Sequence, residues 1–344
     1  MHESQFLSGF QAPGPLFVVG IWRSGTSLLY ALLNQHPQIA LMYEGELPLM
    51  RPLFPGGRPK SDWLQRWDFW NGAPRRHQIG GGSISAQSGG LAATTEYVCR
   101  QFAHRKRATI WGCKSPSYYD ILPRLAQDFP QARFIIIWRD PAAICQSIMD
   151  ASAQSHYFAK RGMLLRALLG YEELKRGCDH LLRSKTAVHQ MHYEDLTRDP
   201  EAELKKICGF LRLPFVPRML SLEDADRSAI YADEHHALVK GTAIVSSARR
   251  PAMLDRKYRN KIAGYVRLWK ERYAHSWPAY HPPFPDNAAK VGLLSRTLDR
   301  ALFRALRFYD NFVLLTYSYA PPAILRGYRE RAHATRIKLA RQEE

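Results

Sequence analysis

The sequence lacks the features of a disulfide-rich, zinc-binding or membrane-spanning protein. Its five cysteines are odd in number and widely spaced, which excludes a disulfide framework and the paired spacing of a zinc site. No run of 18 apolar residues occurs, and the first residues lack the cationic start and apolar core of a signal peptide. We therefore expect reduced thiols and a cytoplasmic location, with any membrane contact peripheral and at the inner face.

Acidic residues are few, because 31 Asp and Glu stand against 49 Lys and Arg, which gives a formal net charge of +18. Such an excess indicates anionic partners. The basic residues are scattered and no DNA- or RNA-binding motif occurs, so we do not expect nucleic acid as the partner. A phosphorylated small molecule, an anionic lipid surface or a polyanionic glycan fits the charge better.

The clearest motif runs from Leu16 to Tyr30, where an apolar strand, a glycine loop and a helix start follow one another. Gly20 and Gly25 have the spacing of a phosphate-binding P-loop, but Thr26 occupies the position of its lysine. In nucleoside triphosphatases that lysine reaches the β- and γ-phosphates. Here the cation is Arg23, inside the loop. A degenerate nucleotide kinase or NTPase is therefore the weaker interpretation.

A second apolar run, residues 133–138, ends at Arg139 and Asp140 and leads into a helix that contains Ser147. Continuous apolar runs that end at a proline are typical of strands buried on both faces of a parallel sheet. Strand ends are where open α/β sheets bind ligands. An alternative for Asp140 is a magnesium ligand of the Walker B type.

Two further apolar runs complete the pattern. Residues 109–113 lead to Lys114, and residues 186–191 lead to Tyr193 and then to a helix that starts near Pro200. Four buried-type runs separated by helical stretches predict an α/β fold of three layers, with a central parallel sheet flanked by helices.

In this order the motifs resemble the sulfotransferases that use 3′-phosphoadenosine 5′-phosphosulfate (PAPS), over about residues 14–275. The resemblance implies the P-loop fold and in-line transfer of a sulfuryl group to a hydroxyl or amine. The expected acceptor is a glycan, a glycolipid or another small molecule, and a peptide tyrosine also suits. No metal is expected, because the sulfuryl group carries less charge than a phosphoryl group.

The resemblance also assigns roles to the motif residues. Arg139 and Ser147 bind the 3′-phosphate, Tyr193 lies near the adenine, and Lys114 neutralises charge that develops on the sulfuryl and bridging oxygens. The 5′-phosphosulfate is cradled by Arg23, Ser24, Gly25, Thr26 and Ser27.

A general base must take the proton of the acceptor. One branch of the family has a histidine two residues after the strand-end lysine, where this chain has Pro116. The branch that includes tyrosylprotein and heparan sulfotransferases uses a glutamate beyond a His-Pro step, and His36 opens such a segment here. It supplies Glu46, the first candidate for the base, and Glu44, the alternative.

A later segment resembles the loop that closes over the nucleotide in this family. We take Arg249 as its phosphate ligand, because an arginine can bind a phosphate with two hydrogen bonds. The other candidates are Lys240, Ser247 and Arg250, and the sequence does not decide among the four.

We expect a sulfotransferase domain at 14–285, with an acceptor-facing insertion or lid at 51–105, and a basic amphipathic helical extension at 286–344. The insertion holds Trp63, Trp67 and Trp70, for which packing is a better interpretation than stacking on an acceptor. In the extension, leucines recur at helical spacing with arginines on other faces, which favours packing on the domain or contact with an anionic membrane. A non-catalytic, membrane-associated nucleotide-binding protein is thus the second alternative. The sequence does not predict the oligomeric state.

Overall fold

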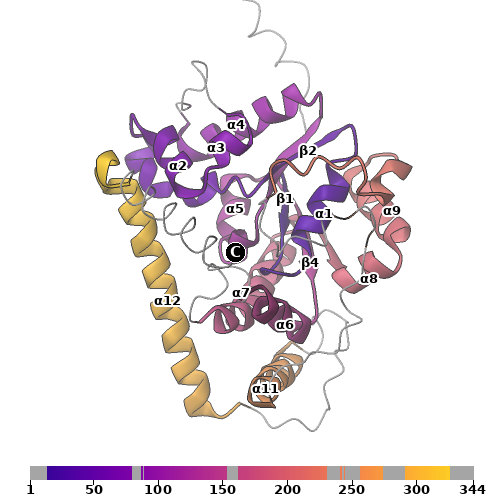
Figure 1. Ribbon diagram of the computed structural model, residues 1–344, viewed down its shortest axis with the longest axis vertical. Helices are drawn as coiled ribbons and strands as arrows, with labels where there is room; N and C mark the ends of the chain where they lie inside the picture. The colour runs from indigo at the N-terminus through magenta and orange to yellow at the C-terminus, as the bar shows by residue number, and fades with distance from the viewer. Residues whose placement is uncertain are drawn as a thin grey trace, which may run out of the picture.

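The computed structural model describes residues 14–79, 87, 89–152, 162–230, 241, 244, 256–273 and 291–325. In this part of the chain a five-stranded parallel sheet of order β2-β3-β1-β4-β5 lies between layers of helices (Figure 1). This arrangement confirms the predicted three-layer α/β fold with its C-terminal helix. The strands are β1 (Leu16–Val19), β2 (Ile39–Tyr43), β3 (Ile110–Lys114), β4 (Arg133–Trp138) and β5 (Ala187–His192).

Alternate residues of the central strands enter two separate hydrophobic cores. Phe17 of β1 and Phe134 of β4 point into the first core, whereas Val18 and Ile135 point into the second. Because both faces of β1 to β4 are buried, these strands read as continuous apolar runs rather than as alternating ones. The edge strand β5 is only partly buried.

The helices divide between the two faces of the sheet in the same way as the cores. The second core is covered by α1 (Thr26–Leu33), α8 (Tyr193–Arg198) and α9 (Pro200–Leu211). The first core is covered by α2 (Trp63–Asn71), α3 (Ala73–Arg76), α4 (Gly90–Arg105), α5 (Leu122–Asp128), α6 (Pro141–Ser152), α7 (Met163–Arg183) and α11 (Arg256–Arg272). Short 3₁₀ turns lie at Leu47–Leu49, Arg51–Leu53, Pro55–Gly57, Pro116–Tyr118 and Pro217–Leu220. All five cysteines are free and buried in these cores.

The register of the sheet gathers the predicted site at one edge. Lys114, the last residue of β3, is paired with Tyr43 at the end of β2 and with Val18 near the end of β1. The glycine loop follows β1 directly, and Arg139 follows β4. All of these positions lie at the carboxyl edge of the sheet, where ligands bind in this class of fold.

The long helix α12 (Leu293–Tyr319) runs along one side of the molecule, with one end near α11 and the other near α2 (Figure 1). It packs on the domain, but its charged side faces inward, where Arg307 forms an ion pair with Asp120 and Asp299 pairs with Lys261. Its leucine-rich side faces outward. None of the helices in the described segments is long and apolar enough to cross a membrane.

Candidate active site

The loop between β1 and α1 is held in a tight conformation by its glycines. A Cβ atom on Gly20 would lie 2.4 Å from the Ser24 hydroxyl, and one on Gly25 would lie 2.3 Å from the Tyr193 ring. Gly25, which caps α1, also has a φ of 99°, which favours glycine. No side chain caps α1, so its first N–H groups remain available to an anion.

Two arginines, the buried Arg139 and the half-buried Arg23, meet beside this loop. Arg23 donates from Nε to the Ser147 hydroxyl at 2.9 Å, and Arg139 donates to the main-chain oxygen of Arg23. The Arg139 guanidinium stands 4.4 Å from the centre of the Tyr193 ring. These four residues, which span more than a hundred positions of the sequence, form what we call the cationic corner. The predicted nucleotide ligands are therefore brought together.

The electrostatics of the cationic corner favour an anion. Burial, and then the positive charge of Arg139, lower the pKa of Arg23 to about 10. Burial also lowers the pKa of Arg139. Two guanidinium groups that have lost hydration and repel each other are stabilised when a negatively charged group binds between or beside them.

Asp140 does not act like a magnesium ligand in this arrangement. Its carboxylate caps α6 by accepting from the Ala142 N–H at 2.8 Å, and its own N–H donates to Glu194 at 3.0 Å. The carboxylate is thus used to fix the start of α6, the helix that carries Ser147. Together with Thr26 in the lysine position, this contact argues against the kinase or NTPase interpretation.

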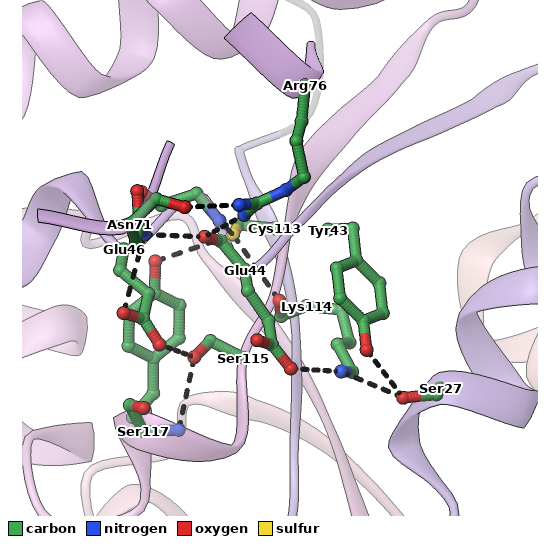
Figure 2. A network of polar contacts seen from close by, with 12 residues as sticks. Ser27, Tyr43, Glu44, Glu46, Asn71, Arg76, Cys113, Lys114, Ser115 and Ser117 are labelled. Atoms are coloured by element: carbon green, nitrogen blue, oxygen red, sulfur yellow. Dashed lines mark hydrogen bonds and ion pairs between the residues drawn. The ribbon is translucent and has the colours of Figure 1, made fainter. Parts of the chain in front are cut away.

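A second polar cluster lies at the ends of β2 and β3 (Figure 2). The Lys114 ammonium donates to Glu44 at 2.7 Å and to the Ser27 hydroxyl at 3.2 Å, and it lies 3.9 Å from the centre of the Tyr43 ring. The Tyr43 and Ser27 hydroxyls are hydrogen-bonded at 3.0 Å. Burial lowers the pKa of Lys114, and the nearby Glu44 carboxylate opposes this shift. We call this cluster the lysine corner, and Ser27 ties it to the glycine loop.

The segment Glu44-Gly45-Glu46 beyond β2 is strained and held by side chains of α2. Both glutamates have a positive φ, 47° and 55°, in the left-handed region that side chains other than glycine rarely adopt. The Trp67 indole donates to the main-chain oxygen of Gly45 at 2.5 Å, and the Asn71 amide donates to the main-chain oxygen of Glu44 at 2.9 Å. These bonds explain how the strained turn is maintained.

The two glutamate side chains have different surroundings (Figure 2). Glu46 is buried, and its carboxylate accepts from the Ser115 hydroxyl at 2.8 Å and from the Trp70 indole at 3.2 Å. Burial raises the pKa of Glu46, and the negative charge of Glu44 adds to the shift. The Glu44 side chain is 16% exposed and points toward Lys114 and Ser27. Of the two carboxylates, only Glu44 contacts the lysine corner.

Several contacts of the site were not predicted from the sequence. Tyr43, Ser115, Trp70 and Asn71 all support the two glutamates or Lys114, and the only signals were the adjacency of the first two to predicted site residues and the tryptophan cluster. Trp63 and Trp67 are buried in the first core, which agrees with packing. The predicted Arg249 lies outside the described residues, as do Lys240, Ser247 and Arg250.

A family model described as "Sulfotransferase family" matches residues 15–217 of the chain. The chain belongs to this family. The match includes all five strands, the cationic corner and the lysine corner, and it ends before α11 and α12. The predicted enzyme class, a sulfotransferase, is therefore confirmed.

Individual relatives of this sulfotransferase are distant. A putative protein-tyrosine sulfotransferase of Caenorhabditis briggsae is 24% identical over 207 residues, which cover 60% of this chain and 68% of that protein. The omega-hydroxy-beta-dihydromenaquinone-9 sulfotransferase of Mycobacterium bovis is 24% identical over 296 residues, which cover 68% of this chain and 72% of that protein. Among solved structures, the sulfotransferase domain from the curacin biosynthetic pathway has a TM-score of 0.48 at 19% identity and covers 74% of this chain and 97% of that domain.

Proposed function

We propose that this sulfotransferase moves the sulfuryl group of PAPS to a hydroxyl group of its acceptor. The observation that carries the proposal is the placement of the cationic corner and the lysine corner on either side of one glycine loop. PAPS is an anion with a phosphate at one end and a phosphosulfate at the other. It therefore fits two groups of donors separated by a helix N-terminus.

Arg139 and Ser147 are the proposed ligands of the 3′-phosphate, with the Tyr193 ring near the adenine. The charge of this corner supports the assignment, since desolvation lowers the pKa values of both Arg139, which is buried, and Arg23, which is half-buried. The loop residues Ser24 to Ser27 would offer backbone N–H groups to the 5′-phosphosulfate. Burial of these donors keeps them oriented and excludes water.

Lys114 and Ser27 are the proposed donors to the group that gains charge as the sulfur–oxygen bond breaks. Their 3.2 Å contact supports this assignment, because it aims the ammonium at the start of α1 rather than at solvent. Donors placed where charge develops typically contribute about 10²-fold to 10³-fold in rate.

For the general base we propose Glu44, which reverses the order predicted from the sequence. A base must lie within hydrogen-bond reach of the reacting hydroxyl. Glu44 is partly exposed and beside Lys114, whereas the two oxygens of Glu46 are occupied by Ser115 and Trp70. Glu46 is then a positioning residue that fixes the turn carrying Glu44.

The acceptor is proposed only as a class. The names of the two relatives refer to protein tyrosine and to an omega-hydroxy quinol, and both groups are hydroxyls. A glycan or glycolipid hydroxyl, or an amine, stays a prediction from the sequence. Contact with an anionic membrane is argued from α12 below.

Calorimetry with 3′-phosphoadenosine 5′-phosphate (PAP) and with ATP, each with and without magnesium, tests the nucleotide assignment. We expect micromolar, magnesium-independent binding of PAP and a loss of at least about tenfold in affinity in Arg139→Ala, because a charge-assisted pair is removed. The substitution Arg198→Ala, at an exposed arginine on α8, is the matched control and should leave PAP binding unchanged. A preference for ATP with magnesium would overturn the proposal in favour of a kinase.

A further inference from the structure

Most of the large apolar side chains that are exposed in the described residues lie on the outward face of α12, which the proposed chemistry does not use. Along this face, six large apolar side chains are 51% to 75% exposed: Leu294, Leu298, Leu302, Phe308, Tyr309 and Phe312. Leu315 and Tyr319 continue the same face toward α2 at 45% and 57% exposure. Exposed apolar surfaces of this extent mark interaction sites in soluble proteins.

The helix is fixed in this orientation by polar contacts on its inner side. Arg300 and Arg307 bind Glu172 and Asp120, and Asp299 accepts from the Tyr265 hydroxyl at 2.9 Å and from Lys261 at 2.6 Å. These contacts use up charged groups that an amphipathic surface helix ordinarily turns to water. The apolar face is therefore held outward by the fold itself.

The C-terminal end of α12 packs against α2, beside the candidate active site. The Tyr317 ring lies edge-on against the Trp70 ring, with 5.5 Å between the ring centres, and the Arg66 guanidinium of α2 donates to the main-chain oxygen of Tyr317 at 3.1 Å. Trp70 in turn donates to Glu46. The outward face and the strained turn of the site thus belong to one packed unit.

We propose that the outward face of α12 binds the surface of an anionic lipid bilayer. The charge of the neighbouring elements supports this occupant. In the sequence, α11 carries seven Lys and Arg residues and one acidic residue, Glu271. Lys261 and Arg272 of α11 and Arg300 and Arg307 of α12 form inward ion pairs, whereas Arg256, Arg259 and Arg304 are exposed. Leucine and aromatic side chains beside a basic polar region are the composition of helices that lie in a membrane interface.

The breadth of the face argues against a second copy of the chain as the occupant. Helix pairs in coiled coils meet along a narrow seam with charged residues on its flanks, which set the register. Here the apolar side chains Leu298, Leu302, Phe308 and Phe312 spread over about a third of the helix circumference at 100° per residue, which is wider than a coiled-coil seam. Arg304 is the charged residue that lies at the rim of this arc and is exposed. A bilayer accepts such a broad face without a matching partner surface.

Co-sedimentation of the full chain with vesicles tests the proposal. We expect binding to phosphatidylcholine vesicles that contain phosphatidylserine, weaker binding to phosphatidylcholine alone, and weakening by salt. The substitutions Leu298→Ser and Phe312→Ser together should lower the partition coefficient at least about tenfold, since two large apolar side chains no longer enter the interface. Leu182→Ser, at a 45% exposed leucine on α7, is the matched control and should leave binding unchanged.

Two further measurements separate the outcomes. Unchanged thermal unfolding and PAP affinity in the double variant establish that lost vesicle binding is not lost folding. Absence of binding to either vesicle by the native chain, or equal binding by the double variant, overturns the proposal. It is also overturned if the native chain is dimeric by light scattering and the double variant is monomeric without a change in vesicle binding.

Discussion

The cationic corner and the lysine corner are built on opposite electrostatic principles. In the first, the half-buried Arg23 and the buried Arg139 lie side by side, and burial together with the positive charge of Arg139 lowers the pKa of Arg23. In the second, Lys114 is balanced by Glu44 at 2.7 Å. The first corner is thus completed by the charge of its ligand. The second is balanced before any ligand arrives and can redistribute its charge and protons during the reaction.

Among the variants that separate the two corners, replacement of Glu44 is expected to lower kcat most. Glu44→Gln should lower kcat by about 10²-fold to 10⁴-fold, because a general base is removed while the size of the side chain is kept. PAP affinity should hold, since the cationic corner is untouched. The measurement is transfer of labelled sulfuryl from PAPS to the best acceptor in a panel of phenols, alcohols and tyrosine peptides.

Glu46→Gln is the matched partner of that experiment and should lower kcat by less than about tenfold. If the two variants lose activity in the reverse order, Glu46 is the base and the proposed roles are exchanged.

Lys114→Met should lower kcat by about 10²-fold to 10³-fold, because the ammonium that faces the breaking bond is lost. Methionine fills most of the buried space of the lysine stem. The same assay, together with PAP calorimetry, checks the result. A rate within a few-fold of the native chain would remove Lys114 from the mechanism.

Ser147→Ala tests the cationic corner and is expected to cause a smaller change, a modest loss of PAP affinity. Loss of one hydroxyl that contacts Arg23 should weaken PAP binding by about three- to tenfold, as expected for a single hydrogen bond. Adenosine 5′-phosphate, which lacks the 3′-phosphate, serves as the control ligand. An equal loss for both ligands would place Ser147 away from the 3′-phosphate.

Protonation of Glu46 should give a small, pH-dependent effect on stability. Its pKa is raised above 4.5 in the folded chain, so the native state binds this proton more readily than the unfolded state. The contribution of this carboxyl to folding therefore falls as pH rises from about 4.5 through the raised pKa. The difference in melting temperature between Glu46→Gln and the native chain should shift in favour of the variant over this interval. Scanning fluorimetry at successive pH values measures this difference, and a difference that does not change with pH would contradict a raised pKa for Glu46.

The cationic corner was predictable from the sequence because its residues sit in short, local patterns. Arg23 lies in the glycine loop after β1 and Arg139 follows β4 directly, and the parallel sheet brings the ends of such runs to one edge. Ser147 lies in the helix that starts right after β4. Once the strands are located, the position of each of these residues follows.

The lysine corner was only partly predictable. Lys114 was found as a strand end, but the roles of Glu44 and Glu46 depend on a left-handed turn and on hydrogen bonds from Trp70 and Asn71. Those two residues stand more than twenty positions further along the chain. No local pattern indicates which of two neighbouring carboxylates they will bury.

Helix α12 illustrates a second limit of sequence patterns. The spacing of its leucines predicts an amphipathic helix, which is present. The same spacing does not indicate which face turns inward. Ion pairs with Glu172 and Asp120 bury the arginine side, and these partners come from other segments of the chain.

The buried cysteines give the molecule a built-in reporter of its own unfolding. Cys99, Cys113 and Cys145 belong to the first core, and Cys208 belongs to the second. Burial raises the pKa of all four thiols, so the reactive thiolate is scarce in the folded state. A thiol reagent added to the native protein can modify such groups only when a core opens. A comparison of the labelling rates of the first-core cysteines with that of Cys208 therefore shows which side of the sheet unfolds first.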